Sequence, residues 1–557
     1  MVRAFLSAMG VEVRGMHQAA YLLALFALLS QLLALVRDRL LAASFGAGPT
    51  LDVYYAAFRI PDLLFATVAS LLSLYALLPV LSKLEEEGGG RTAAFLGRTL
   101  GMFFAAMAVI AGVLFVFAPA LVSLLMPGIN SPELVLLTRI LLLQPILLGA
   151  SNILASLTQL RHRFLLYSVS PLLYNVGIII GIIALYPRLG VAGLAWGVVL
   201  GALMHVGLQV PFYTRERAQA AARMPLGEAW RKTRAVLALS LPRTAALGAG
   251  QLSLLALTFM ASFLAAGSIA VFTFAFNLFS VPLAIIGVSY SVAAFPTLSR
   301  LHAAGEHSEF LRHIEAALRH MLFWTIPATV FVIVLRAQLV RTILGSGAFD
   351  WEATRLTAAA LAIFVTALCA QSITLLVSRG YYAAGRTARP LLFATVSVAV
   401  SVCSAAFLVA AFHTSTFWRY FLESLLRVSD IPGTTVLVLA LGFALGSIVQ
   451  AVMGLYYFAH EFELPVAPLR RLVFESFTAA VIGGAVAYAV LAYLGTRLDI
   501  NTAAGIVSQG AVAGIAGLVA VALTLALLRN RELIEAYGAL RKRLVSEPPA
   551  LEATDVA

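Results

Sequence analysis

The stretch at residues 33–61, LALVRDRLLAASFGAGPTLDVYYAAFRIP, places charged side chains inside two apolar runs. The first run carries the triplet Arg-Asp-Arg at 37–39, and the second carries Asp52 and Arg59. A charged side chain at the centre of a membrane span costs about 2.5–3.5 kcal/mol, and spans keep such residues where they face a bundle interior or a water-filled cavity. The stretch therefore predicts a functional site inside a membrane-embedded fold.

The composition of the whole chain indicates a polytopic membrane protein. Of its 557 residues, 61% are hydrophobic and 11% are charged, with a mean hydropathy of +0.95. Soluble domains carry about 25% charged residues. The net charge of +12 is assigned to basic cytoplasmic loops rather than to nucleic-acid binding, because no soluble basic domain is present. Cys369 and Cys403 lie in apolar stretches and are expected to be packing residues.

The predicted fold class is an all-α membrane protein with about fourteen transmembrane helices, since a span needs about 20 mostly apolar residues. The N-terminal segment leads into the first span and is expected to be a membrane anchor rather than a cleaved signal peptide. The spans are expected near 18–45, 52–80, 97–125, 132–158, 165–187, 191–213, 236–264, 268–298, 318–344, 353–380, 389–413, 433–459, 471–495 and 503–528.

The distribution of basic residues predicts that both termini are cytoplasmic. With the N-terminus inside, most of the 38 lysines and arginines fall in the segments assigned to the cytoplasm, which agrees with the positive-inside rule. The longest internal loop, YTRERAQAAARMPLGEAWRKTR at 213–234, is also the most basic. It is interpreted as a topology determinant and linker, with contact to anionic lipids as the alternative.

The two halves of the chain form an internal repeat. ASFGAGPTLDVYYAAFRIP begins at Ala43 and ASFLAAGSIAVFTFAFNLFSVP at Ala261, which gives Phe58 and Phe276 the same offset. Six spans separate the copies, so the repeat is parallel, and repeated halves around a midplane cavity are typical of transporters. The predicted domains are an N-lobe at 1–213, a basic linker at 214–235, a C-lobe at 236–459, two further helices at 460–528 and a cytoplasmic tail at 529–557.

Sequence motifs for catalysis, metal binding or ATP binding are lacking. The chain has no Gly-x4-Gly-Lys-Ser/Thr loop, no His-Glu-x-x-His and no paired cysteines, and no serine and histidine form a recognisable nucleophilic pair. His205, in the sixth predicted span, is interpreted as a packing residue. We therefore expect a transporter that has no catalytic residue, cofactor or metal and does not hydrolyse ATP by itself.

Two arginines near the opening stretch are expected to face one cavity. Arg37 lies nine residues before Gly46, and Arg59 lies seven residues after Asp52; at 1.5 Å per residue these are depths of about 13 Å and about 10 Å. Asp38 is expected to hold one arginine as an ion pair, leaving the other for a ligand whose phosphate oxygens suit a guanidinium fork. The alternatives are a helix–helix ion pair of Arg59 with an aspartate, or snorkelling to the interface.

Several stretches resemble the MurJ (MviN) lipid II flippase family of the MOP exporter superfamily. The main one is RDRLLAASFGAGPTLDVYYAAFRIPDLL, supported in order by RHRFLLYSVSPLLYN, GLAWGVVLGALMHVGLQVP, MASFLAAGSIAVF, FPTLSRL, GSGAF and RGYYAAGRTARP. The similarity covers about residues 20–530. By this resemblance, Arg37 and Asp38 match an Arg-Asp pair in the first span, Asp52 matches an acidic residue after the Gly-rich turn, and Arg59 matches a basic residue before the proline.

The chain departs from the family pattern at four positions. Gln31 and Asn277 stand where the family has cavity arginines, and Phe65 and Ser70 stand where it has an arginine and a glutamate. Gln31 and Asn277 are kept as candidate substrate-binding residues, because their amides can hydrogen bond a phosphate. The cationic lining is therefore concentrated in the first half of the chain, and an anionic ligand would be held asymmetrically.

The resemblance implies a bacterial inner-membrane flippase for peptidoglycan biosynthesis and so for cell shape. It would move a polyprenyl-pyrophosphate-linked precursor, lipid II, from the inner to the outer leaflet by alternating access, driven by the membrane potential or a cation gradient. The last two helices would form a groove for the lipid tail. The implied partners are this lipid-linked glycan pyrophosphate, membrane lipids and cell-wall synthesis proteins.

Three other functions stay open at this point. The chain is alternatively an exporter of another lipid-linked oligosaccharide, a MATE-like small-molecule exporter whose cavity needs unpaired acidic residues, or a scaffold without transport. Residues 414–432, TSTFWRYFLESLLRVSDIP, look like an insertion and predict an amphipathic helix on the outer surface.

Overall fold

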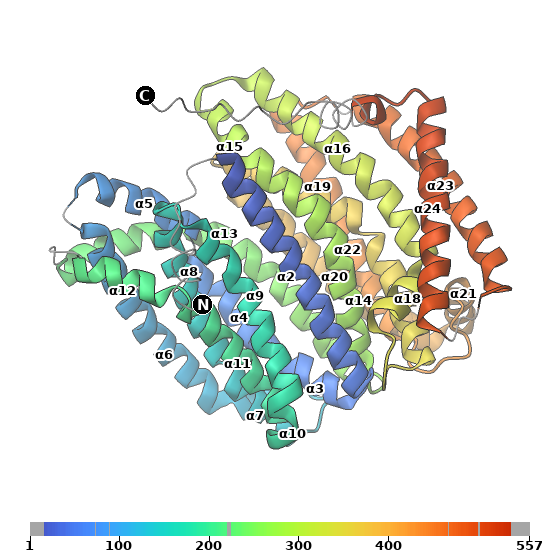
Figure 1. Cartoon of the computed structure of the whole chain (residues 1–557), viewed down its shortest axis with the longest axis horizontal. Helices are drawn as coiled ribbons and strands as arrows, with labels where there is room; N and C mark the ends of the chain where they lie inside the picture. Colours follow the sequence, from blue (N-terminus) through green and yellow to red (C-terminus); the bar gives the residue numbers. More distant parts are fainter. Residues whose placement is uncertain are drawn as a thin grey trace, which may run out of the picture. The chain divides into compact units, whose positions relative to one another are not determined.

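The computed structural model describes residues 16–72, 74–88, 90–219, 224–465, 467–498 and 502–535. Within these ranges the chain forms helices and turns and no strand, which confirms the all-α prediction (Figure 1). Parts of three predicted segments lie outside the described residues, namely the start of the membrane anchor (1–15), the middle of the linker (220–223) and most of the tail (536–557).

The helices follow one another closely along the chain. In order they are α2 (Met16–Phe45), α3 (Pro49–Ala57), α4 (Arg59–Thr67), η1 (Ala69–Leu72), α5 (Leu74–Glu86), α6 (Arg91–Leu125), α7 (Pro132–Leu141), α8 (Leu143–Leu160), α9 (Phe164–Ile180), η2 (Gly181–Leu185), α10 (Tyr186–Leu189), α11 (Val191–Gly207), α12 (Val210–Gln219), α13 (Leu226–Ser262), α14 (Ser268–Pro282), η3 (Leu283–Val288), α15 (Ser289–Ala303), α16 (His307–Val334), α17 (Arg336–Leu344), α18 (Trp351–Val365), α19 (Leu368–Ala383), α20 (Ala388–Thr414), α21 (Thr416–Leu426), α22 (Val436–Phe462), α23 (Ala467–Gly495) and α24 (Ala503–Leu527).

The chain divides into two compact units. The first consists of Met1–Leu278, Ile343–Phe364 and Thr387–Gln450, and the second of Phe279–Thr342, Val365–Arg386 and Ala451–Ala557. The first unit joins the predicted N-lobe to three parts of the predicted C-lobe, residues 236–278, 343–364 and 387–450. The lobe boundaries drawn from the sequence stay a prediction.

Eleven helices of the described residues are long and apolar enough to cross a membrane, or thirteen when two bent helix pairs count as one span each. The number fourteen stays a prediction. The predicted span at 353–380 is not one helix, because α18 ends at Val365 and α19 begins at Leu368.

The predicted second span, at 52–80, is also broken. It divides at Phe58 between α3 and α4, and it bends by 42° between Pro49–Thr67 and Ala69–Glu86. Pro61 accounts for the first break, because its ring lacks an N–H and clashes with the carbonyl four residues earlier, at Ala57. At the bend, Thr67 Oγ1 donates to the Leu63 carbonyl (2.6 Å), and such side-chain bonding to the preceding turn bends helices.

The basic linker is helical on both sides of its undescribed middle, which differs from the loop expected at 214–235. Two acidic residues of the linker form ion pairs with arginines of other segments, Glu216 with Arg161 (3.0 Å) and Glu228 with Arg91 (2.5 Å). The many alanines of the segment favour a helix, and these ion pairs neutralise part of its charge against the ends of α6 and α8.

Close backbone contact between α9 and α11 depends on glycines spaced four residues apart. Gly177 on α9 and Gly181, the first residue of η2, face Gly201 and Gly197 on α11, and a Cβ added at any of the four would overlap backbone atoms of the facing segment. Small residues at this spacing allow helices in membranes to approach closely. This contact holds α9 in position, and α9 carries three residues of the site described below, Tyr174, Asn175 and Ile178.

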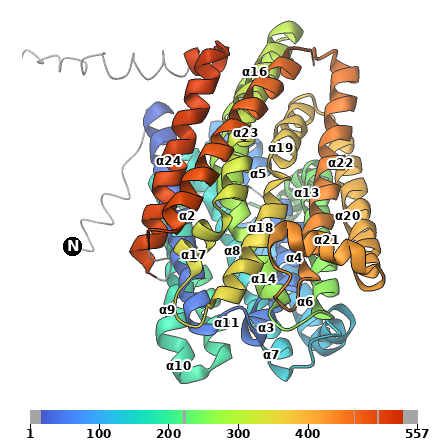
Figure 2. The same ribbon diagram turned by 90° about the vertical axis from the view of Figure 1, so that its right-hand side faces the viewer.

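The second unit contains the last two helices, α23 and α24, which lie side by side (Figure 2). Gly483 and Gly517 meet where they cross, since a Cβ added at either would lie 2.8 Å from the carbonyl oxygen of the other. Large apolar side chains remain exposed on the outside of the pair, including Phe474 and Leu523. An apolar surface of this kind is suited to contact with lipid chains.

The prediction of an amphipathic helix within 414–432 is confirmed by α21. Its N-terminus is capped by Ser415, whose Oγ accepts from the Trp418 N–H (3.3 Å). On one face, buried Glu423 accepts from the Thr434 hydroxyl (2.6 Å), while aromatic side chains such as Phe417 are exposed on another. The surface on which this helix lies stays a prediction.

The turn that follows α2 is packed tightly against the turn before α14. Gly46 ends α2 with φ +62°, and a Cβ there would lie 2.7 Å from the Ala348 carbonyl oxygen. Gly267 has φ +89°, and its Cβ would overlap the Ala47 carbonyl. The Ala348 N–H donates to the Ala43 carbonyl (2.8 Å), so turns from both halves of the repeat meet at this end of the first unit.

We predict that Gly267→Ala destabilises the protein more than Gly190→Ala. Both residues have positive φ, at +89° and +59°, a backbone conformation that strains a residue with a Cβ. Only Gly267 adds a clash, because no atom lies within 4 Å of a Cβ at Gly190. Thermal unfolding of the two purified variants should show a Tm several degrees lower for Gly267→Ala. Equal Tm values would contradict the tight packing of this turn.

Candidate functional site

A cavity of about 300 Å³ lies inside the first unit. It is formed where α2, α3, α4, α8, α9, α13 and α14 come together, and it combines cationic, acidic, amide and aromatic side chains. The lining residues are Arg37, Leu41, Tyr54, Tyr55, Phe58, Arg59, Asp62, Gln144, Tyr174, Ile178, Gln251, Leu254, Thr273, Phe276 and Asn277.

The internal repeat explains how the two halves share this cavity. Phe58 and Arg59 occupy the same repeat positions as Phe276 and Asn277, and all four side chains line the cavity. The break that Pro61 causes in the second span lies beside the first pair. Each repeat therefore supplies one aromatic and one polar side chain, but only the first supplies a charge.

Asp38 joins three helices at one side of the cavity. Its Oδ1 accepts from Arg37 Nε (2.9 Å) and Nη2 (2.7 Å), and its Oδ2 accepts from the Asn277 amide on α14 (3.0 Å). Arg37 also donates from Nη1 to Asn175 Oδ1 on α9 (3.1 Å). Asp38 is 3% exposed, and a buried carboxylate needs such a complete set of donors. The charge of Arg37 is thus largely balanced within the protein.

Arg59 is less constrained. Its Nε is buried and has no hydrogen-bond partner among the described residues. Asp62 lies three residues further on α4 and interacts with it electrostatically, while the Gln144 side chain hydrogen bonds that carboxylate. Arg59 therefore keeps donors that a ligand in the cavity can use.

Further polar atoms at the cavity wall are buried without a partner in the described part of the chain. They are Tyr55 Oη, Gln144 Oε1 and Thr273 Oγ1. Buried polar atoms are almost always hydrogen-bonded in folded proteins, and exceptions need an explanation. Their grouping with Arg59 Nε around one cavity indicates a site for a polar, anionic ligand.

Some of the predicted site residues line the cavity, and others do not. It brings Arg37, Arg59 and Asn277 to one cavity, with Asp38 behind them as the partner of Arg37. Gln31 lies on α2, partly exposed, and is not among the residues that line the cavity. No ion pair of Arg59 with Asp38 or Asp52 is found in the described residues.

Asp52 lies away from the cavity and caps the N-terminus of α14. The N–H groups of Gly267 (2.5 Å) and Ala270 (2.8 Å) donate to its two carboxylate oxygens. An acidic side chain at a helix N-terminus is stabilised by the helix dipole. The sequence does not reveal this contact, because the donors lie more than 200 residues further along the chain.

The sequence analysis missed Asp62, Gln144 and the tyrosines of the cavity. The signal for Asp62 was present, because a carboxylate three residues after Arg59 lies on the same side of a helix. Gln144 was visible as an amide inside the predicted span at 132–158. Tyr54, Tyr55 and Tyr174 could not be separated from ordinary packing residues by sequence alone.

Comparison with known proteins identifies the family. A model of the family described as lipid II flippase MurJ matches residues 41–507. The chain belongs to the MurJ family of lipid II flippases. The resemblance noted in the sequence is thereby confirmed, and the chain is a multi-pass inner-membrane protein of a transporter family concerned with peptidoglycan.

Individual relatives agree with this assignment. The lipid II flippase MurJ of Burkholderia cenocepacia is 28% identical over 369 residues, covering 64% of this chain and 71% of the relative. A probable lipid II flippase MurJ of Rhizobium tropici is 26% identical over 384 residues, covering 67% and 72%.

Solved structures show the same fold. A lipid II flippase MurJ in an inward closed conformation superposes with a TM-score of 0.69 at 20% identity, covering 92% of this chain and all of the other. An inward-facing MATE multidrug resistance transporter of the MOP superfamily gives a TM-score of 0.62 at 15% identity, covering 78% and 94%. The chain therefore shares its fold with both of these solved structures.

We predict that Asp38→Asn destabilises the protein by about 3 kcal/mol, because removing one member of a buried ion pair leaves the other uncompensated. Asp350→Asn is the matched control, since Asp350 is exposed and caps α18, where Asn serves equally well. Thermal unfolding of both purified variants measures the difference. Two equally small shifts in Tm would show that Asp38 does not hold the three helices together.

Proposed function

We propose that this protein translocates lipid II, the polyprenyl-pyrophosphate-linked peptidoglycan precursor, from the inner to the outer leaflet by alternating access. The single observation that carries the proposal is the buried, unpartnered Nε of Arg59 in a cavity that also contains Arg37. A guanidinium presents several donors in one plane and suits the oxygens of a pyrophosphate. Family membership and the relatives named above support the same substrate.

The two arginines have unequal roles in this proposal. Arg37 is held by Asp38 and Asn175, so it contributes a fixed positive field. Arg59 has free donors and is the direct ligand of the pyrophosphate. Asn277 gives its amide to Asp38 and so acts on the substrate through the position of Arg37, and Gln31 is kept as a weaker candidate.

Alternating access requires a closed outer end while the cavity faces inward. With both termini in the cytoplasm, the turn after α2 lies on the outer side. There the cap of Asp52 on α14 and the glycine-dependent contact of the turns close the cavity, and both have to open for release. The apolar outer surface of α23 and α24 would receive the lipid tail.

Transport of this kind needs no covalent step, so the protein is proposed to be a carrier and not an enzyme. Cell-wall synthesis enzymes that make or consume the precursor are the proposed protein partners. A MATE-like mechanism is not favoured, because the two carboxylates at the cavity, Asp38 and Asp62, both interact with arginines and are not open to a cation.

We predict that Arg59→Gln strongly lowers rescue of a conditional flippase-depleted bacterium while it destabilises the protein less than Arg37→Gln does. Loss of a hydrogen bond to a charged group costs about 1.5–3 kcal/mol, which is a fall of roughly 10- to 100-fold in transport. The loss of stability is small because Arg59 Nε has no hydrogen-bond partner among the described residues for the mutation to remove. Arg37→Gln should lower both rescue and Tm, since it leaves Asp38 unpaired.

Arg139→Gln is the matched control, because Arg139 lies over the Phe115 ring (4.7 Å) and outside the cavity. It should rescue fully. Full rescue by Arg59→Gln would reject the proposed site. If the wild type is expressed but moves a fluorescent lipid-linked oligosaccharide of another kind, and not lipid II, in reconstituted vesicles, the substrate is the other glycan.

A further inference from the structure

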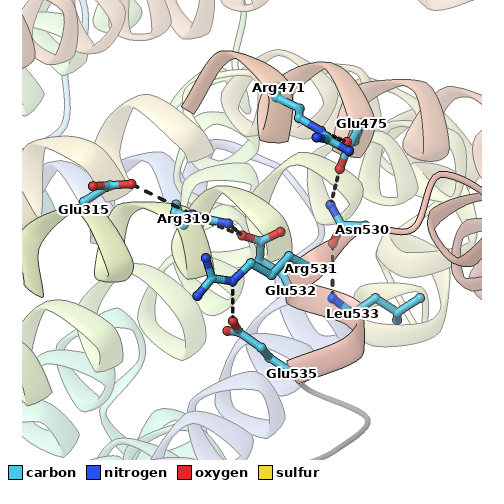
Figure 3. A network of polar contacts seen from close by, with 9 residues as sticks. All are labelled: Glu315, Arg319, Arg471, Glu475, Asn530, Arg531, Glu532, Leu533 and Glu535. Carbon is cyan, nitrogen blue, oxygen red and sulfur yellow. Dashed lines mark hydrogen bonds and ion pairs between the residues drawn. The ribbon is translucent and has the colours of Figure 1, made fainter. Parts of the chain in front are cut away.

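A second pocket, of about 340 Å³, lies in the second unit and is separate from the cavity of the first. It is formed by α16, α23 and the short helical segment that follows α24 (Figure 3). Its polar lining consists of four arginines and two glutamates, Arg319, Arg471, Arg529, Arg531, Glu475 and Glu532.

The two glutamates are buried and already have partners. Glu532 is 4% exposed and accepts from Arg319 Nε (2.7 Å). Glu475 accepts from Arg471 Nε (2.6 Å) at one oxygen and from the Asn530 amide (2.7 Å) at the other. This network ties α16, α23 and the helical segment after α24 together (Figure 3).

Two arginines at the rim remain open to a ligand. Arg529 is exposed, and its side chain has no hydrogen bond to any described residue. Arg531 hydrogen bonds Glu535, four residues on (2.7 Å), and lowers the pKa of that carboxyl below its ordinary value. Such an exposed pair within one helix contributes little stability, so Arg531 can exchange this partner for another anion. Glu315 and Glu535 also lie beside Arg319 and Arg531, so among the described residues Arg529 is the arginine of this lining whose charge has no carboxylate partner.

Exposed apolar side chains lie close along the chain to two arginines of the pocket, Arg471 and Arg529. Phe474 is 68% exposed and lies three residues after Arg471, on the same side of α23. Leu527, at the end of α24 and two residues before Arg529, is 85% exposed. A ligand that fits both surfaces carries an anionic head and an apolar tail. An anion without a tail would leave this apolar surface unused.

We propose that this pocket binds the phosphate headgroup of an anionic membrane phospholipid, with Arg529 and Arg531 as the groups that contact it. Basic pockets at the ends of transmembrane helices bind such headgroups, and the arginine fork matches phosphate oxygens. The site does not depend on the proposed transport function. If both termini are cytoplasmic, the lipid comes from the inner leaflet.

Native mass spectrometry of the full-length protein in detergent tests the proposal. Phosphatidylglycerol is titrated against the wild type and against the double variant Arg529→Gln/Arg531→Gln, with zwitterionic phosphatidylcholine as the reference lipid. The double variant should bind phosphatidylglycerol about tenfold more weakly, and phosphatidylcholine unchanged. Arg312→Gln on α16 is the matched control, because its exposed ion pair with Glu309 lies outside the pocket; it should bind like the wild type.

The double variant should fold, because the partners of Glu475 and Glu532 stay in place, and its Tm provides the check. If it does not fold, Arg529→Gln alone is used, since that side chain has no described partner to lose. Equal phosphatidylglycerol binding by folded variant and wild type would overturn the proposal. Displacement of the lipid by equimolar inorganic phosphate or pyrophosphate would overturn the lipid assignment in favour of a diffusible anion.

Discussion

The Asp38 carboxylate is the constraint on which the cavity depends. Charges inside the membrane are expensive unless they are paired, and Asp38 satisfies this condition for Arg37 while also accepting from Asn277. Through Arg37 the contact extends to Asn175 on α9. One side chain on α2 thus connects the helices of the first repeat with α14 of the second. Its neighbour Arg39 bonds instead to the Ile343 carbonyl (3.3 Å), so the triplet links α2 to surrounding segments on two sides.

The break in the second span then determines which side chains face the cavity. A continuous second span would place its side chains at regular helical spacing. Pro61 breaks the helix after α3 instead, and the break lies beside Phe58 and Arg59, which both line the cavity. The same region bends again near Val68. Breaks in a membrane helix are tolerated where they are buried in protein or line a cavity, and the first of these breaks lies at the cavity wall.

The sequence was sufficient for the fold class, because apolar runs of about 20 residues are a strong signal. It was also sufficient to bring Arg37 and Arg59 together, because helix rise and a shared turn set their depth. The sequence analysis predicted one continuous helix at 52–80 and one at 353–380, whereas each of these ranges is broken. Hydropathy reports the length of an apolar run but not the local hydrogen bonding that interrupts a helix. The sequence analysis also grouped Asp52 with the cavity because a cap on a distant helix has no local signature. Asp62 was overlooked although its spacing from Arg59 was informative.

The cap of Asp52 on α14 has a consequence for how such a sequence can change over time. The carboxylate bonds to the backbone N–H groups of Gly267 and Ala270 and not to their side chains. Any residue other than proline offers the same N–H, so the bond itself does not need the side chain of residue 270, which is a fully buried alanine for reasons of packing. Position 267 is restricted to glycine by its backbone angle and the nearby carbonyl. The hydrogen bonds of this contact therefore need a particular residue type at only two positions, an acidic residue at 52 and a glycine at 267.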